Sequence, residues 1–147
     1  MHIHLHVGES QGKPAYEPVH VESLGQRRFA LLYTPGLAYG VAAGDLLEVE
    51  DDGSYKVLSR GGNVAVRVFT EHPAVGIEKE LTTRVQTELH GRLDGKMLRG
   101  LAYTVPIEAG FKSIETVFND LVARTPGSVW EYGNVYSDNG DPIGWWL

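Results

Sequence analysis

The feature that most constrains the fold is a change of hydrophobic period along the chain. Between residues 19 and 70, apolar and polar residues alternate in five short runs, and Val64, Val66 and Val68 form the clearest of them. A period of two is typical of strands with one buried face. The turns between the runs contain Asp-Gly and Gly-Gly steps, which favour hairpins. This half therefore predicts five short antiparallel strands in a small, strongly bent, barrel-like sheet.

Beyond residue 76 the hydrophobic period becomes helical in two segments, which alternate with two further strand-like runs. Gly91 is placed to adopt the left-handed conformation that ends the first helix. Ser113 is placed to cap the start of the second helix. The predicted elements are, in order, a helix over 77–89, a strand over 101–105, a helix over 113–124 and a strand over 129–136.

The expected fold class is therefore α+β, with the barrel-like sheet first, an αβαβ half after it and both helices packed on one face. No linker-like segment divides the two halves, so we expect one domain. Two Gly and two Pro residues between positions 8 and 18 predict a loop there. The expected parts are an N-terminal strand and loop (1–18) and a single domain (19–147) with a β-rich half (19–70), an αβαβ half (77–136) and an aromatic tail (137–147).

The chain begins with MHIHLHV, in which His2, His4 and His6 alternate with three apolar residues. On a straight strand His2 and His6 would lie about 13 Å apart, whereas zinc holds its nitrogen ligands at about 2 Å. No His-Glu-x-x-His motif supplies further ligands. We therefore expect a strand with its apolar residues buried and its histidines facing solvent, and we predict no metal site, with metal binding by these histidines as the less favoured alternative.

Composition and charge argue against several classes of function. The 147 residues include no cysteine, so disulfides and thiolate chemistry are excluded. The net charge is −6 and no run of Lys and Arg exists, which argues against a nucleic-acid ligand. No apolar run approaches the roughly 20 residues that span a bilayer, and the N-terminus lacks a signal-peptide pattern. We expect a cytoplasmic protein with no membrane partner and no cofactor.

Several turns occur together in an order typical of one family. The segment YTPGLAYGVAAGDLLEVEDDGSYKVLSRGGNVAVRVF combines a Pro-Gly step, an Ala-rich turn ending in Gly-Asp, a short strand and an Arg-Gly-Gly-Asn turn. GRLDG, GFKSIE, WEYGNVY and PIGWW follow in the second half. Over residues 19–147 the chain resembles an uncharacterised bacterial family, the domain of unknown function numbered 4265. The resemblance implies one coherent domain and supplies no catalytic residue.

Sequence motifs of known catalytic chemistry are missing. Gly61 and Gly62 precede a valine-rich strand, so the helix N-terminus that would hold a phosphate is lacking. Glu48 and Glu50 stand beside a hairpin, which is a poor position for a pair of hydrolytic carboxylates flanking a cleft. No Gly-x-Ser-x-Gly motif occurs. We therefore predict no catalytic residue, and a non-catalytic protein is favoured over an enzyme.

Four residues within or beside predicted strands could still line a ligand pocket: Asp45, Arg67, Tyr103 and Asn134. Asp45 follows Gly44, and an Asp in such a turn commonly accepts hydrogen bonds from nearby backbone N–H groups. That structural role is favoured over catalysis. Convergence of the four residues, with displaced pKa values, would indicate a ligand site.

The C-terminal segment WEYGNVYSDNGDPIGWWL is rich in aromatic and acidic residues. Trp and Tyr are enriched at binding hot spots, and they also seal the cores of small domains. We expect the tail to dock against the sheet, whereas an exposed tail would leave an apolar surface for a partner. The candidate partner-binding residues are Trp130, Glu131, Tyr136, Asp138, Asp141, Trp145 and Trp146.

These observations lead to two hypotheses of function. The first is a non-catalytic bacterial protein-binding module with a basic protein partner, such as an immunity protein that neutralises a cognate toxin. The acidity, the missing catalytic motifs and the aromatic–acidic C-terminus favour it. The second is a small-molecule-binding protein or an enzyme that uses a cleft between sheet and helices.

Overall fold

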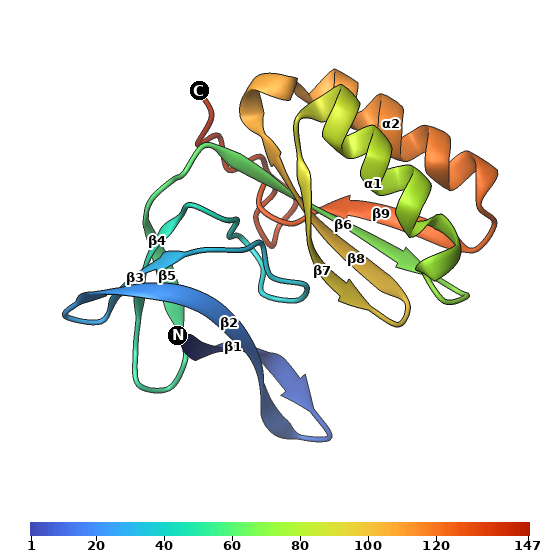
Figure 1. Ribbon diagram of the computed structural model, residues 1–147. Coiled ribbons are helices and arrows are strands. Elements are labelled where there is room, and N and C mark those ends of the chain that lie inside the picture. Colours follow the sequence, from blue (N-terminus) through green and yellow to red (C-terminus); the bar gives the residue numbers. More distant parts are fainter.

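Two antiparallel sheets and two long helices make up the protein, as Figure 1 shows. The computed structural model describes residues 1–147, except for the side chain of Val75. The fold class is α+β, as predicted. The elements are β1 (His2–Ser10), β2 (Lys13–Gly25), β3 (Arg28–Leu31), β4 (Leu46–Val49), β5 (Tyr55–Ser59), β6 (Asn63–Thr70), α1 (Val75–Leu89), β7 (Arg92–Met97), β8 (Gly100–Pro106), the 3-10 helix η1 (Ile107–Ala109), α2 (Phe111–Arg124) and β9 (Ser128–Tyr132).

The second sheet has the strand order β7-β8-β6-β9, and each neighbouring pair is antiparallel. Together with its helices it follows the chain order β-α-β-β-α-β, which is the ferredoxin-like or split βαβ arrangement. Both helices cover one face of this sheet, and the first sheet lies beyond the other face (Figure 1). The prediction that the helices share one face is confirmed.

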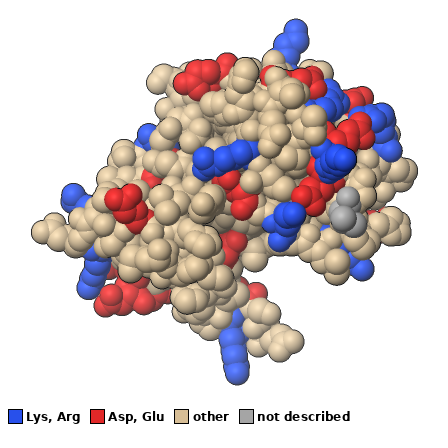
Figure 2. Space-filling view, viewed as in Figure 1, with Lys and Arg blue, Asp and Glu red and all other residues tan. Residues whose placement is uncertain are grey.

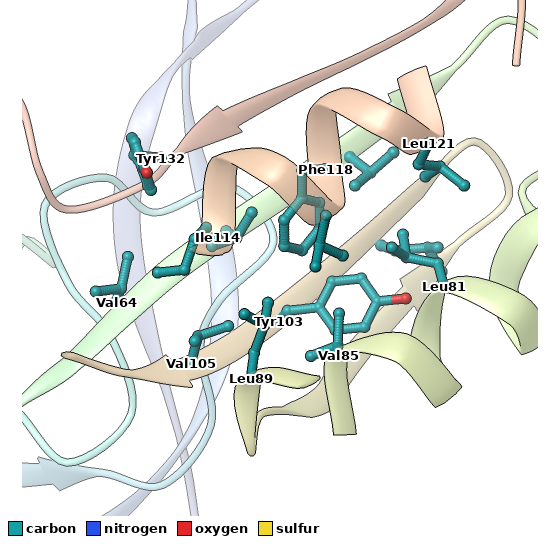
Figure 3. Close-up of a cluster of buried hydrophobic side chains, with 14 of the residues drawn as sticks. Val64, Leu81, Val85, Leu89, Tyr103, Val105, Ile114, Phe118, Leu121 and Tyr132 are labelled. Carbon is teal, nitrogen blue, oxygen red and sulfur yellow. The ribbon is translucent and has the colours of Figure 1, made fainter. Parts of the chain in front are cut away.

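The core under the helices follows from the period of two in β6 and β8. Alternate residues such as Val66 and Tyr103 are fully buried and pack against the helices. Ile114 and Phe118 lie one turn apart on α2 and point into the same space, which Figure 3 shows from within. The intervening strand residues, such as Arg67, face the opposite side of the sheet.

The first sheet is a meander in the order β1-β2-β3-β4-β5 around a smaller core that includes Leu5 and Leu47. The sheet curls until the His6 N–H donates to the Gly53 carbonyl at 2.9 Å, which joins β1 to the β4–β5 turn. Gly53 has φ +87, and a Cβ there would lie 3.0 Å from the His4 carbonyl oxygen, so this approach requires glycine. The described strands form a bent, open sheet and no closed barrel.

The loop predicted over residues 8–18 is wrong, because β1 and β2 form a long hairpin with a turn at Gln11 and Gly12. The two prolines misled the prediction, since proline cannot donate to a strand ladder. His6 uses its N–H outside the β1–β2 pair, so His6 and its partner Tyr16 form a non-hydrogen-bonded pair. Pro14 and Pro18 lie two residues either side of Tyr16 and therefore also point their nitrogens away from β1. No ladder hydrogen bond is lost at either proline.

Between the helices the structure has two strands, β7 and β8, where the sequence predicted one. β7 escaped prediction because its sequence, RLDGKM, lacks apolar alternation and carries a bulge between Leu93 and Gly95. The left-handed residue ending α1 is His90 (φ 55), so the prediction of Gly91 was one residue late. The cap predicted at Ser113 is also wrong, since α2 already begins at Phe111.

Candidate functional site

The N-terminal histidines lie on β1, and the predicted alternation holds from His2 to Leu5 but is lost at His6 and Val7, which are both half-buried at a register shift. Leu5 is fully buried, whereas His2 and His4 are exposed and His6 is half-buried. His2 stands opposite His20 on β2, and their Nε2 atoms are 3.2 Å apart. Apart from the undescribed side chain of Val75, no group of three or more His, Cys, Asp or Glu residues is arranged to hold a metal ion.

The four residues proposed to line a ligand pocket do not converge on one cavity. Tyr103 faces the helices, where its hydroxyl hydrogen-bonds Thr82 Oγ1 at 2.9 Å. Arg67 faces the other side of the same sheet. The fully buried Asn134 bridges the backbone, since Oδ1 accepts from Ala65 N–H and Nδ2 donates to the Asn63 carbonyl. The sheet therefore separates Tyr103 from Arg67.

Asp45 acts as a turn carboxylate, in line with the role that its sequence context favoured. Its carboxylate accepts hydrogen bonds from the N–H groups of Ala42 (3.0 Å) and Gly61 (2.9 Å). Arg60 Nη1 lies 3.5 Å from Oδ2. Burial raises the pKa of Asp45 despite these N–H donors and the nearby guanidinium. The side chain thus ties the β3–β4 connection to the turn before β6.

Arg67 anchors the segment between β3 and β4 to the second sheet. Its Nη1 donates to the Gly36 carbonyl at 3.0 Å, and its guanidinium lies 5.0 Å from the centroid of the Tyr39 ring. Nε makes no hydrogen bond with the described residues, although Glu131 Oε1 is 3.3 Å away. The side chain is almost fully buried, so the guanidinium joins the two sheets rather than facing an open site.

A second polar network, centred on Asp94 of β7, fastens the same loop and was not predicted from the sequence. The side chain of Asp94 is buried, and Oδ2 accepts from the Thr34 N–H at 2.7 Å and from the Thr104 hydroxyl. Oδ1 accepts from Arg92 Nε at 2.7 Å. Thr34 and Thr104 also share a hydrogen bond of 2.7 Å between their hydroxyls. The network spans 60 residues of sequence between Thr34 and Asp94.

Glu17 of β2 holds the loop from the other side. Its two carboxylate oxygens accept hydrogen bonds from three consecutive backbone N–H groups, those of Gly36, Leu37 and Ala38, at 2.7 to 3.2 Å. Glu17 and Asp94 line a cleft of about 150 Å³ between the first hairpin and β7. Both carboxylates are therefore already engaged in holding the loop.

The predicted partner-binding residues of the C-terminus separate into two groups. Glu131 and Asp138 lie near the loop. Burial is the largest cause of the raised pKa of Tyr39, and the negative charges of these two residues raise it further. Trp130 lies on the helix side, stacked on Phe118, with Nε1 donating to Asn119 at 2.7 Å. β9 itself separates the groups, since successive strand residues point to opposite faces.

The aromatic tail docks, as predicted, with its two tryptophans half-buried against the main core. Trp145 donates from Nε1 to the Asn134 carbonyl at 2.9 Å, and Arg60 lies 5.9 Å from its ring centroid. Trp146 packs against Phe111 of α2 with ring centroids 5.0 Å apart. Asp141 is exposed in a turn within the tail, where its carbonyl accepts from the Ser137 N–H.

Docking of the tail creates a hollow, the aromatic pocket, of about 180 Å³ beside the start of α2. Phe111 stands at 81° to Tyr132 and at 74° to Trp146. The Tyr132 hydroxyl donates to Glu115 Oε2 at 2.8 Å, and burial together with this carboxylate raises the pKa of Tyr132. The aromatic pocket is defined by Phe111, Glu115, Tyr132, Tyr136 and Trp146, with Val135 and Pro142 completing its lining.

Sequence reasoning selected Tyr136 and Trp146 but missed the three other members of the aromatic pocket. Phe111 and Glu115 are one turn apart on α2, and this i, i+4 spacing at the helix start was a usable signal. Tyr132 could be placed only through the register of β9 with β6. The pocket is therefore a product of tertiary structure.

Charges of both signs are interspersed on the face shown in Figure 2, including the part formed by the helices. Arg84 pairs with Asp120 at 2.6 Å, and Arg124 pairs with Glu80 at 2.9 Å. These pairs join α1 to α2 at the surface. Neither long helix of the described chain has the length and apolar character needed to cross a membrane.

A known structure resembles this protein in fold, and a family model matches its sequence. The structure is similar to the crystal structure of a hypothetical protein from Neisseria gonorrhoeae, with a TM-score of 0.69 and 14% identity, covering 88% of this chain and 91% of that one. No curated protein matches the sequence. Residues 17–130 match the family described as Domain of unknown function (DUF4265). Since this match spans most of the chain and includes strands of both sheets, the protein belongs to the DUF4265 family.

Proposed function

We propose that this chain is a non-catalytic protein-binding module that takes a basic protein partner at the aromatic pocket. The observation that carries the proposal is the group of four aromatic rings beside one carboxylate, Glu115, at the surface. Tyr136 is 42% exposed there, although the tail has already docked. Partly exposed Tyr and Trp side chains with a polar rim are typical of interface hot spots.

The charge of the protein supports a basic partner. The net charge is −6, and an acidic protein attracts basic partners and steers their approach. In the finer form of the proposal, the module acts in the bacterial cytoplasm as an immunity protein that neutralises a cognate toxin. The surface charge and the uncovered pocket are the features that support this form.

The alternative, a small-ligand-binding protein or enzyme, has less support. The cleft beside Glu17 and Asp94 has two carboxylates in its lining, yet both already accept hydrogen bonds from backbone and side-chain donors. Asp45, Arg67 and Asn134 are likewise engaged with the backbone. The polar groups of this region thus support a role in joining the two sheets.

Affinity capture from the native host tests the proposal with a matched pair of variants. Tyr136→Ala removes an exposed ring of the aromatic pocket, and Tyr16→Ala removes a similarly exposed ring, 47% exposed, from β2 of the first sheet. We expect the wild type and Tyr16→Ala to retain a basic protein that Tyr136→Ala loses. Equal retention by both variants, or a captured protein that is acidic, would contradict the proposal.

The immunity form has a separate test. The captured basic protein is expressed in a host with and without the wild-type chain, and we expect the chain to restore growth. Growth restored equally by Tyr136→Ala would contradict the role of the aromatic pocket, and unimpaired growth without the chain would contradict the immunity form.

A further inference from the structure

The aromatic pocket has walls that meet nearly at right angles. Phe111 is close to perpendicular to both Tyr132 and Trp146, with ring centroids 5.6 Å and 5.0 Å away. Tyr136 stands 6.3 Å from Tyr132, centroid to centroid. A cation is attracted to an aromatic ring within about 6 Å of its centroid. A group seated between these rings would therefore be near several of them at once.

The single carboxylate of the pocket has one oxygen available. Glu115 Oε2 accepts from the Tyr132 hydroxyl, whereas Oε1 has no hydrogen bond from the described residues. The nearest cation along α2, Lys112, lines a different surface hollow together with Glu88. The negative charge of Glu115 is therefore not neutralised by an ion pair within the described structure.

We propose that the aromatic pocket binds the ammonium group of a lysine side chain of the partner, with the rings around the charge and Glu115 Oε1 accepting from it. This inference rests on the proposed function and specifies what the basic partner presents. Lysine fits better than arginine because a compact ammonium can contact walls that meet at right angles. A planar guanidinium stacks well on only one of them.

The volume and the setting of the pocket fit such a group. About 180 Å³ can hold the end of one side chain, but it is below the range of about 300 Å³ and more that is usual for small-molecule sites. Val135 and Pro142 supply apolar surface for the methylene stem, as long lysine side chains require. The Tyr132 hydroxyl donates its proton to Glu115 and so orients the carboxylate, and burial together with Glu115 raises the pKa of Tyr132 further above neutral pH.

Nuclear magnetic resonance with three probes tests the proposal on the whole chain. The probes are Nα-acetyl-lysine methylamide, its norleucine analogue and its arginine analogue. We expect the lysine probe to shift the indole N–H resonance of Trp146 and to leave that of Trp130 unchanged, since Trp130 donates to Asn119 outside the pocket. The norleucine probe should bind at least about tenfold more weakly than the lysine probe, because it lacks the cation.

Two variants test whether binding of the lysine probe depends on the carboxylate of Glu115. Glu115→Gln keeps a partner for the Tyr132 hydroxyl but removes the charge, and we expect about fivefold weaker binding of the lysine probe. Glu9→Gln removes an exposed carboxylate from β1 and should leave binding unchanged. Equal binding of lysine and norleucine probes, tighter binding of the arginine probe, an unshifted Trp146, or equal effects of the two variants would each overturn the proposal.

The outcomes also separate this inference from the proposed function. Lysine binding without a captured partner would support the pocket chemistry and remove the protein-binding role. A partner that Tyr136→Ala loses, combined with no response to the lysine probe, would keep the protein-binding role and remove the lysine assignment.

Discussion

On one face of strand β6, Val66 and Val68 pack against two helices, and on the other face Arg67 reaches a loop. The helix face is held by apolar burial around Tyr103 and Phe118 (Figure 3). The loop face is held by hydrogen bonds to the segment between β3 and β4: Arg67 donates to the Gly36 carbonyl, and Asp94 accepts from the Thr34 N–H. One sheet is thus covered by two different kinds of interaction.

The difference lies in what each kind of interaction specifies. Apolar burial is non-directional and roughly proportional to area, so it supplies most of the folding free energy. Hydrogen bonds between buried groups add little net stability, but they are costly when left unpaired and they require one geometry. The helix face therefore stabilises the second half, whereas the loop face fixes the position of the first sheet.

The largest effect is expected from the helix face. Phe118→Ala removes a fully buried ring from between α2 and the sheet, and it should lower the free energy of unfolding by about 4 kcal/mol. The loss should be global, because this core joins both helices to all the strands beneath them. Urea unfolding followed by tryptophan fluorescence measures it, with a single transition at a lower midpoint.

Val129→Ala on β9 is the control, since Val129 is 60% exposed. It should change the free energy of unfolding by less than about 0.5 kcal/mol. A Phe118→Ala loss no larger than this would show that the helix face does not carry the stability assigned to it.

A smaller and more local effect is expected from the loop face. Asp94→Ala removes a buried carboxylate, leaves the Thr34 N–H and the Thr104 hydroxyl without their acceptor, and should cost about 3 kcal/mol. Amide hydrogen exchange should rise most in residues 34–44, while amides under the helices keep much of their protection. Asp51→Ala, which removes a carboxylate that is 90% exposed, should leave the same amides unchanged.

The same exchange measurement can also show that the helix face and the loop face are not held separately. If Asp94→Ala lowered protection equally in residues 34–44 and in α2, the two faces would unfold as one unit. The loop would then belong to the same cooperative core as the helices, and directional bonds would have no separate role.

The same contrast explains what the sequence could predict. The helix face could be predicted because Val64, Val66 and Val68 and the α2 stripe repeat with the period of their own element. The loop face depends on residues such as Thr34 and Asp94, which are 60 positions apart and belong to no local pattern. Their pairing follows only once both sheets are folded, so no local rule could find it.

The errors in local structure have related physical causes. Pro14 and Pro18 argued for a loop, yet each proline nitrogen points away from β1 in the hairpin. β7 lacks apolar alternation because one of its buried side chains is polar. This is Asp94, whose carboxylate accepts a hydrogen bond from the Thr34 N–H of the loop. In the candidate site, Tyr136 and Trp146 could be selected from composition, and the i, i+4 spacing of Phe111 and Glu115 was a local signal that went unused. Tyr132 could be placed only through the register of β9.

The smallest change in the free energy of unfolding is expected within the helix face, where the Tyr103 hydroxyl is a polar group in an otherwise apolar core. Tyr103→Phe removes the hydrogen bond to Thr82 and should cost about 1 kcal/mol at neutral pH. Burial raises the pKa of Tyr103 from 10.0 to about 12, so between these values the native state binds more protons than the unfolded state. The wild type should therefore lose stability as the pH rises through this window, with Tyr103 contributing up to about 1.4 kcal/mol per pH unit.

The phenyl ring introduced by Tyr103→Phe cannot ionise, so the variant lacks this contribution. Tyr39, Tyr55 and Tyr132 also have raised pKa values, and the variant should therefore still lose stability in alkali, but less steeply than the wild type. Urea unfolding of both proteins at about pH 7 and about pH 11 measures the difference. We expect the deficit of the variant to shrink or reverse at the higher pH. A deficit that stays constant or grows would mean that the Tyr103 hydroxyl reaches water in the native state, and the helix face would then be less dry than its apolar lining implies.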